Sequence, residues 1–249
     1  FLSVDGGVDM HMHGPIFFDA ILKLIKGGKL TEERINKACA KILEAKFRLG
    51  LFENRYVTEA GIKKTVFTKK HQQTALEIAR RSIVLLKNES LLPVDTQKFK
   101  KILVTGPNAN NQSIMGDWVF EQPEKNVSTI LKGIKEEASG TQINYVDVGW
   151  NMRALDSAKI EKAIQTAKSS DLAIVIVGED SFRQHWKEKT CGENRDRMDI
   201  TLWGKQDYLV ESIYKTGVPT IVILVNGRPL ATGWVAENIP AVIEAWEPG

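Results

Sequence analysis

Acidic and basic side chains are mixed in one short segment of this chain, residues 179–197. Its acids are Glu179, Asp180, Glu188, Glu193 and Asp196, and its bases are Arg183, His185, Lys187, Lys189, Arg195 and Arg197. A carboxyl group in such surroundings can serve as a proton donor, as a base or as the partner of a cation. A solvated surface loop has the same composition, so residue types alone leave a catalytic and a structural interpretation open.

Buried strands would position this segment. Leu172–Gly178 is almost continuously apolar, which indicates a strand covered on both faces of a parallel sheet. Open sheets of this kind bind ligands just beyond the carboxyl ends of their strands. A second such strand, Thr220–Val225, precedes Arg228, which we expect in the same crevice, orienting a carboxylate or a sugar hydroxyl. Pairing of Arg228 with a structural acid, such as Asp199 or Glu244, is the alternative.

Two further groups of residues are candidates for ligand contacts. Trp186 and Trp118 fall in loops, where an indole ring can stack on a sugar, although aromatic side chains more often belong to a core. Asp9, His11 and His13 lie two apart, so on a strand they would share one face and could ligate a metal. Ordinary hydrogen-bonded polar side chains at a strand end are the favoured alternative for these three.

Composition excludes several classes of function. The chain has 249 residues, and its 34 basic and 31 acidic residues are well mixed, so no basic stripe marks a nucleic-acid interface. No apolar run approaches the roughly 18 to 20 residues of a membrane span. Residues 105–110 follow a strand but lack the glycine spacing of a nucleotide-binding loop. The two cysteines, Cys39 and Cys191, give no reason to expect a disulfide.

Strand and helix patterns alternate through the second half of the chain. Strands are expected at residues 101–106, 143–148, 172–178, 220–225 and 241–246, with helices at 156–168 and 205–214. This alternation implies crossover connections, and hence an α/β fold with a mainly parallel sheet sandwiched by helices.

The first hundred residues have a different pattern. Helices are expected at residues 16–26, 31–49 and about 70–87, with Thr31 capping the second. Two amphipathic helices bury too little apolar surface to form a core of their own. We therefore expect residues 1–50 to close a larger domain, residues 51–100 to form a linker and a helix, and residues 101–249 to form the α/β sandwich.

Eight short motifs are distributed along the whole chain. They are Gly7-Val-Asp-Met-His-Met12, Ala45-Lys-Phe-Arg-Leu-Gly-Leu-Phe52, Ser82-Ile-Val-Leu-Leu-Lys-Asn-Glu89, Leu92-Pro93, Thr105-Gly-Pro-Asn-Ala-Asn110, Val177-Gly-Glu179, Asn226-Gly-Arg-Pro-Leu230 and Ala245-Trp246. Together they resemble glycoside hydrolase family 3, a broad family of retaining β-glucosidases and β-xylosidases. The combination of motifs is specific, whereas one of them alone would mean little.

The resemblance implies an active site shared by two domains. A barrel carries the nucleophilic aspartate in a Ser-Asp-Trp-like motif, and an α/β sandwich supplies the acid/base glutamate from a long loop. No Ser-Asp-Trp occurs here, and Gly116-Asp-Trp118 falls in the sandwich, so Asp117 is not expected to be the nucleophile. Residues 1–50 resemble the closing strand and helices of a (β/α)8-like barrel. The missing barrel is thus the expected partner of this chain, which we expect to be inactive alone.

Several family members have a Glu-x-x-Asp-Arg pattern on the acid/base loop, which Glu193-Asn-Arg-Asp-Arg197 resembles. Glu193 is therefore the leading proton donor, and Glu179, in a Gly-Glu just after a strand, is the alternative. Asp9, Trp186 and Arg228 are the expected substrate contacts.

The resemblance also implies a class of substrate. The intact enzyme is expected to hydrolyse terminal β-linked glucosyl residues of β-glucosides or oligosaccharides, without an organic cofactor or a metal. A β-xylosidase and a noncatalytic carbohydrate-binding or scaffold domain are the alternatives. The resemblance favours a secreted or periplasmic location and allows a homodimer.

Overall fold

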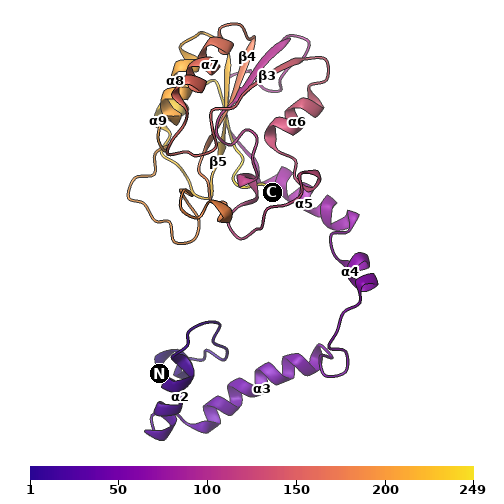
Figure 1. The fold of residues 1–249 in the computed structure, drawn as a ribbon, viewed down its shortest axis with the longest axis vertical. Helices are drawn as coiled ribbons and strands as arrows, with labels where there is room; N and C mark the ends of the chain where they lie inside the picture. Colours follow the sequence, from indigo (N-terminus) through magenta and orange to yellow (C-terminus); the bar gives the residue numbers. More distant parts are fainter. The chain divides into compact units, whose positions relative to one another are not determined.

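The computed structural model describes residues 1–249, which form two compact units, Phe1–Lys69 and Lys70–Gly249. Figure 1 shows helices alone in the first unit and a sheet with flanking helices in the second. No helix in either unit combines the length and the apolarity needed to cross a membrane.

The first unit contains α1 (Leu2–Asp5), α2 (Phe17–Lys26), α3 (Glu32–Arg48) and α4 (Glu59–Thr65). The expected helices at 16–26 and 31–49 are confirmed, and the Thr31 hydroxyl accepts a hydrogen bond from the backbone N–H of Arg34 at 3.2 Å, as the predicted cap requires. Residues on α2 and α3 are largely exposed in this unit, including Phe18 at 70% and Phe47 at 61%.

The strand face proposed for Asp9, His11 and His13 is wrong. These residues lie in an irregular loop between α1 and α2. Gly7 and Gly14, at φ of 108° and 140°, turn the chain on either side of them, and the first unit has no strand with which they could pair. The imidazole of His11 instead stacks on Phe17, with 3.9 Å between ring centroids.

The second unit is built around a six-stranded sheet in the order β1-β6-β5-β4-β2-β3. The strands are β1 (Val84–Asn88), β2 (Lys101–Thr105), β3 (Gln142–Val146), β4 (Leu172–Gly178), β5 (Thr220–Val225) and β6 (Ala241–Glu244). All neighbours are parallel except β1 and β6. The α/β fold with a mainly parallel sheet is therefore confirmed, as are its five expected strands.

The helix expected at about 70–87 is only partly correct. The helix α5 spans Lys69–Ser82, and the chain then continues as the edge strand β1. The run of Ile83, Val84, Leu85 and Leu86 is apolar and begins with two β-branched residues, which favour a strand. Pairing with β6, more than 150 residues later, completes this strand.

Helices cover both faces of the sheet. The α-helices are α6 (Ile130–Glu137), α7 (Ser157–Ala167), α8 (Gln206–Tyr214) and α9 (Gly233–Asn238), and the short 3-10 helices are η1 (Ser113–Met115), η2 (Glu124–Asn126) and η3 (Arg183–His185). Figure 1 shows α7, α8 and α9 on one side of the sheet and α6 on the other. Two separate cores result, because alternate residues of each strand point to opposite faces.

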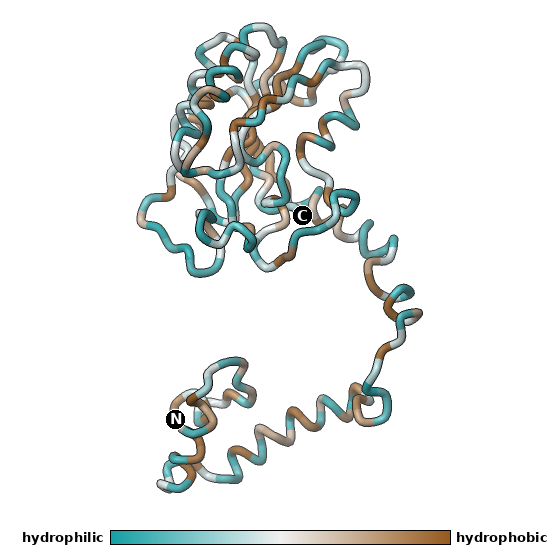
Figure 2. The backbone as a smooth tube through the Cα atoms, in the orientation of Figure 1, coloured by the Kyte–Doolittle hydropathy of each residue, from teal (hydrophilic) through white to brown (hydrophobic).

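The residues of β2 illustrate this alternation. Leu103 belongs to the same buried cluster as Ile160 of α7 and Leu209 of α8, whereas Ile102 belongs to the second cluster, together with Leu131 of α6. Figure 2 shows hydrophobic residues concentrated in the strands of this unit and hydrophilic residues in the loops around them. The loops at the strand ends are thus the places where polar chemistry can be held.

The sheet order changes direction between β2 and β4, and sheets of this kind bind ligands beyond the strand ends at such a point. Gly106, just after β2, and Gly178, the last residue of β4, allow close backbone approach: a Cβ on Gly106 would lie 2.0 Å from the Ile176 carbonyl oxygen, and one on Gly178 would lie 1.9 Å from that of Val225. The buried Asn108 amide donates to the carbonyls of Glu179 and Val225, at 3.1 and 3.3 Å, and so ties three strand ends together.

Candidate active site

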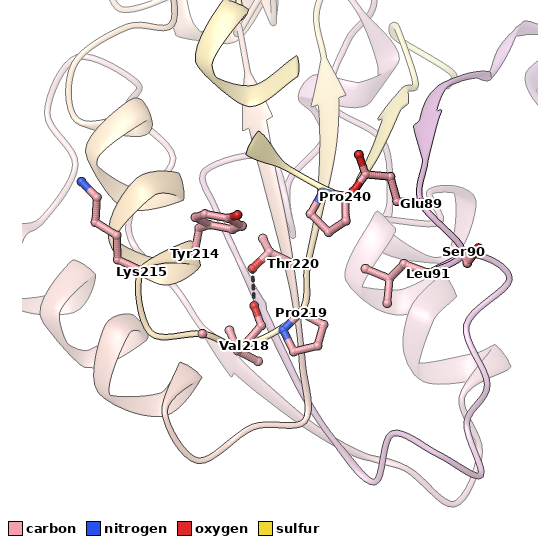
Figure 3. A pocket seen from close by; sticks show the side chains of 10 residues that line it. Glu89, Ser90, Leu91, Tyr214, Lys215, Val218, Pro219, Thr220 and Pro240 are labelled. Atoms are coloured by element: carbon pink, nitrogen blue, oxygen red, sulfur yellow. Dashed lines mark hydrogen bonds between the residues drawn. The ribbon is translucent and has the colours of Figure 1, made fainter. Parts of the chain in front are cut away.

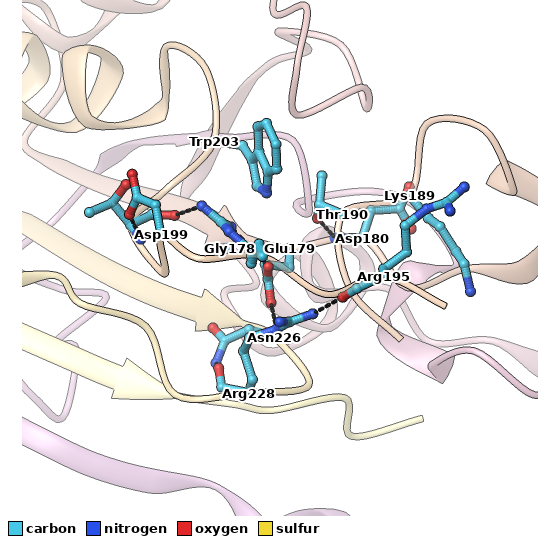
Figure 4. Close-up of polar contacts among 12 residues, drawn as sticks. Gly178, Glu179, Asp180, Lys189, Thr190, Arg195, Asp199, Trp203, Asn226 and Arg228 are labelled. Atoms are coloured by element: carbon cyan, nitrogen blue, oxygen red, sulfur yellow. Dashed lines mark hydrogen bonds and ion pairs between the residues drawn. The ribbon is translucent and has the colours of Figure 1, made fainter. Parts of the chain in front are cut away.

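Glu179 is fully buried at the carboxyl end of β4, between Arg197 and Arg228. Figure 4 shows its carboxylate beside Arg228. One carboxylate oxygen lies 3.0 Å from Nη1 of Arg197, and the other lies 3.1 Å from Nε of Arg228. Both oxygens are therefore held by cations. Arg228 therefore pairs with a structural acid, which was the alternative interpretation of this residue. The acid is Glu179 and not Asp199 or Glu244.

The same two arginines bind the backbone of the loop that follows Glu179, residues 180–205. Nη2 of Arg228 donates to the carbonyl of Arg195 at 2.8 Å, and Nη2 of Arg197 donates to that of Thr201 at 2.7 Å. The guanidinium of Arg197 also lies 4.5 Å from the centre of the Trp203 ring. Glu179 thus anchors the later part of the loop through its cationic partners.

Asp180 anchors the earlier part of the loop. Its buried carboxylate accepts hydrogen bonds from the Ser113 hydroxyl and the Phe182 backbone N–H, both at 2.9 Å, and contacts Nδ1 of His185 at 2.6 Å. Thr190 closes this part of the loop. Its backbone N–H donates to the Asp180 carbonyl at 2.7 Å, and its hydroxyl accepts the backbone N–H of Asp180 at 2.9 Å. Two adjacent buried acids therefore fix the base of the loop.

Glu193 differs from Glu179 in its exposure. Its side chain is 42% exposed, and its Oε2 has one partner, Nη1 of Arg183 at 2.9 Å. The residues on either side, Gly192 and Asn194, have φ of 85° and 59°, so the backbone turns sharply around Glu193. This arrangement presents the carboxyl group to solvent on a loop that is anchored at its base.

A buried ion pair that sequence reasoning missed lies directly beneath Glu193. The carboxylate of Asp117 accepts the backbone N–H of Glu193 at 2.6 Å and contacts Nζ of Lys189 at 3.0 and 3.1 Å. Burial raises the pKa of Asp117, but the hydrogen bonds from Glu193, Lys189 and Arg183 outweigh it and lower the pKa below its ordinary value. Asp117 and Lys189 are 72 residues apart, so no sequence spacing signals their contact.

Trp186 and Trp118 both lie beside cations. The Trp186 ring is 41% exposed and has Lys189, Arg183 and Arg195 at 4.4, 5.2 and 5.4 Å from its centre. Trp118 is 72% exposed, with the Arg183 guanidinium 3.7 Å from its ring. Both indoles are therefore on the surface near Glu193, through their shared contact with Arg183.

Asp9 belongs to the first unit, where two basic residues of α3 hold it. Its carboxylate lies 2.6 Å from Lys41 and 2.9 Å from Arg34. The hydrogen bond from Lys41 is the main cause of a lowered pKa for Asp9. Neither unit contains a group of three or more His, Cys, Asp or Glu side chains that could hold a metal ion.

Glu247 is a second acid that sequence reasoning missed. The hydroxyl of Ser181 donates to its carboxylate, and burial raises its pKa above the ordinary value. Burial also raises the pKa of the Cys191 thiol, with Glu179 and Glu247 contributing to the shift. The region beyond the strand ends therefore combines carboxylates held by cations with groups that burial favours in their neutral forms.

A cavity of about 510 Å³ lies at the other end of β5 (Figure 3). Its lining includes Pro219 and Thr220, at the start of β5, and Pro240, just before β6. The Thr220 hydroxyl donates to the Val218 carbonyl at 2.9 Å, and the charged residues of the lining, Glu89 and Lys215, pair with Lys87 and Glu211 rather than with each other. We therefore assign the candidate active site to the carboxyl ends of the strands rather than to this cavity.

Comparisons with known proteins match this arrangement to one family. Residues 83–249 match the model of the glycosyl hydrolase family 3 C-terminal domain. A beta-xylosidase of Formosa agariphila is 35% identical, and a periplasmic beta-glucosidase of Salmonella typhimurium is 30% identical; each match covers 100% of this chain and 35% of the relative. This chain thus spans about a third of the length of these relatives.

Solved structures agree with these relatives. A beta-glucosidase involved in saponin metabolism, from intestinal bacteria, superposes with a TM-score of 0.83 at 28% identity, over 99% of this chain and 39% of the other. The beta-glucosidase of Listeria innocua in complex with isofagomine gives 0.82 at 28% identity, over 99% and 33%. This chain belongs to glycosyl hydrolase family 3, and residues 83–249 are its C-terminal domain.

Proposed function

We propose that this chain supplies the acid/base carboxyl, Glu193, of a retaining β-glycosidase whose nucleophile lies on a further domain. Retaining hydrolysis needs a carboxylic acid near the leaving oxygen and a carboxylate nucleophile about 5 Å away. The acid first gives its proton to the leaving oxygen, and its carboxylate then takes a proton from the attacking water. Asp117 does not serve as the nucleophile, because its oxygens bind Lys189 and the backbone of Glu193.

One observation carries the assignment of Glu193 over Glu179. The Glu193 side chain is 42% exposed and has one cationic partner, whereas the Glu179 side chain is 0% exposed and has a cation at each oxygen. A general acid must reach the leaving oxygen of a substrate. Glu193 can do so from the surface, while Glu179 would first have to leave two arginines.

Relatives support two substrates. The relatives named above are a beta-xylosidase and a beta-glucosidase. We therefore propose that the complete enzyme removes terminal β-linked xylosyl or glucosyl residues. Exposed Trp186 and Trp118 would stack on the leaving group of the substrate. Arg228 would act indirectly, by holding the loop that carries Glu193.

Leaving-group dependence tests this function in the complete enzyme. Glu193→Gln should lower kcat/KM for a disaccharide by roughly 100-fold or more, and for a dinitrophenyl glycoside by less than about threefold, since only the poor leaving group needs a proton. Glu188→Gln, which changes another carboxyl of the same loop, is the matched control and should resemble wild type. Equal losses on both substrates for Glu193→Gln would refute the proposal.

A further inference from the structure

The loop that carries Glu193 rests on a charged residue from a different part of the chain. Asp117 follows η1, beyond the end of β2, whereas Glu193 follows β4. The side chain of Asp117 is 10% exposed, and its Oδ2 accepts the backbone N–H of Glu193 at 2.6 Å. This bond fixes the backbone from which the Glu193 carboxyl extends.

Lys189 is the buried counter-ion of Asp117. Its side chain is 0% exposed, and Nζ lies 3.0 and 3.1 Å from the two oxygens of Asp117, its only hydrogen-bond acceptors. A buried cation without a carboxylate partner is strongly destabilising. The pair therefore keeps Asp117 charged and in place beneath Glu193.

Two further contacts tighten this arrangement. A Cβ on Gly192 would lie 2.7 Å from Oδ2 of Asp117, so a larger residue at this position would push against the carboxylate. Nη1 of Arg183 lies 2.9 Å from Oε2 of Glu193 and 3.3 Å from Oδ1 of Asp117. One guanidinium thus links the side chain of Glu193 to the same carboxylate that holds its backbone.

We propose that Asp117 is a positioning residue for the acid/base Glu193, with buried Lys189 as its counter-ion. This inference rests on the proposed function, because it concerns the geometry of that proton donor. Asp117 itself does not touch the substrate. A misplacement of about 1 Å at a catalytic group can cost roughly 100-fold in rate, so the loss of this support should slow the steps that need the proton.

The test uses the complete enzyme and a pair of charges removed together. In Asp117→Ala/Lys189→Met neither charge stays buried alone, so the domain should remain folded. We expect kcat/KM for a disaccharide to fall about 10- to 100-fold and kcat/KM for a dinitrophenyl glycoside to stay within about threefold. Asp117→Asn/Lys189→Met keeps an oxygen acceptor for the Glu193 N–H and should recover most of the disaccharide rate.

A second variant and a control separate the possible outcomes. Gly192→Ala places a methyl group against Asp117 and should give the same selective loss on the disaccharide. Glu211→Ala/Lys215→Met removes an ion pair at the C-terminal end of α8, with side chains 32% and 66% exposed, and should resemble wild type. Equal losses on both substrates, or no loss, in the Asp117→Ala/Lys189→Met and Gly192→Ala enzymes would overturn the inference. If Glu193→Gln slows both substrates equally, the proposed function is refuted, independently of the role of Asp117.

Discussion

Replacing Glu179 by glutamine tests whether this residue stabilises the domain rather than catalyses. The substitution removes the charge that Arg197 and Arg228 share, while keeping the size of the side chain. Breaking a buried ion pair from one side costs about 3–5 kcal/mol. The partner side chains are 9% and 26% exposed and keep their bonds to backbone carbonyls, so the lower end of that range applies, about 3 kcal/mol.

Tryptophan fluorescence during urea unfolding measures this effect. All six tryptophans lie in the second unit, so their emission reports on the domain that contains Glu179. With a urea dependence of about 2 kcal/mol per M, a loss of about 3 kcal/mol lowers the midpoint by about 1.5 M. Glu193→Gln breaks an ion pair whose two side chains are 42% and 29% exposed. An exposed pair of this kind contributes about 0.2–1 kcal/mol, so the urea midpoint should shift by less than about 0.5 M.

The two variants are judged against each other. If Glu179→Gln unfolds within about 0.5 M of wild type, or if Glu193→Gln is equally costly, the division into a structural and an exposed glutamate is wrong.

Three other predictions concern stability, activity and association. Burial raises the pKa of Glu247 above 4.5, so the folded state favours the protonated side chain. The resulting contribution to the free energy of unfolding is complete below pH 4.5 and is lost as the pH rises through the raised pKa. Glu247→Gln, which mimics the protonated form, should therefore have a higher urea midpoint than wild type near pH 7 and a similar one near pH 4; the reverse order would contradict the sign. The 249-residue chain alone should release no nitrophenol from a nitrophenyl β-glycoside, because the second carboxyl is absent; turnover that Glu193→Gln abolishes would contradict this. Apolar side chains on α2 and α3 should make the isolated chain self-associate in sedimentation experiments, and Phe18→Ser should reduce the association, whereas a wild-type monomer would argue against it.

Local patterns were sufficient to predict most of the fold. The apolar run of Leu172–Gly178 became β4 with every residue buried, and Thr31 caps α3 through its side chain, as a local motif should. The failure at β1 has a nonlocal cause, since Val84–Asn88 becomes a strand by pairing with β6. Likewise, Asp9, His11 and His13 have the spacing of a strand face but no strand to pair with.

In the candidate site, too, local sequence predicts some features and long-range contacts determine the others. Residue types predicted that Glu179, Glu193 and Arg228 would gather beyond the strand ends, but they could not assign partners. Burial and pairing distinguish the two glutamates, and both depend on the packed structure. From the sequence, Asp117 can be compared only with the nucleophile motif, because its contact with Glu193 joins residues 76 apart. Long-range contacts of this kind leave no periodic signal in a single sequence.

Azide rescue of a Glu193 variant tests the central claim most directly. In the complete enzyme, Glu193→Ala should form a glycosyl-enzyme from a dinitrophenyl glycoside but hydrolyse it slowly, because water lacks its base. Azide needs no base: it attacks the anomeric carbon, releases the nucleophile carboxylate and yields a β-glycosyl azide. The account predicts that azide accelerates turnover of Glu193→Ala and that this product is found by NMR. Rescue of Glu179→Ala instead, with none for Glu193→Ala, would contradict it.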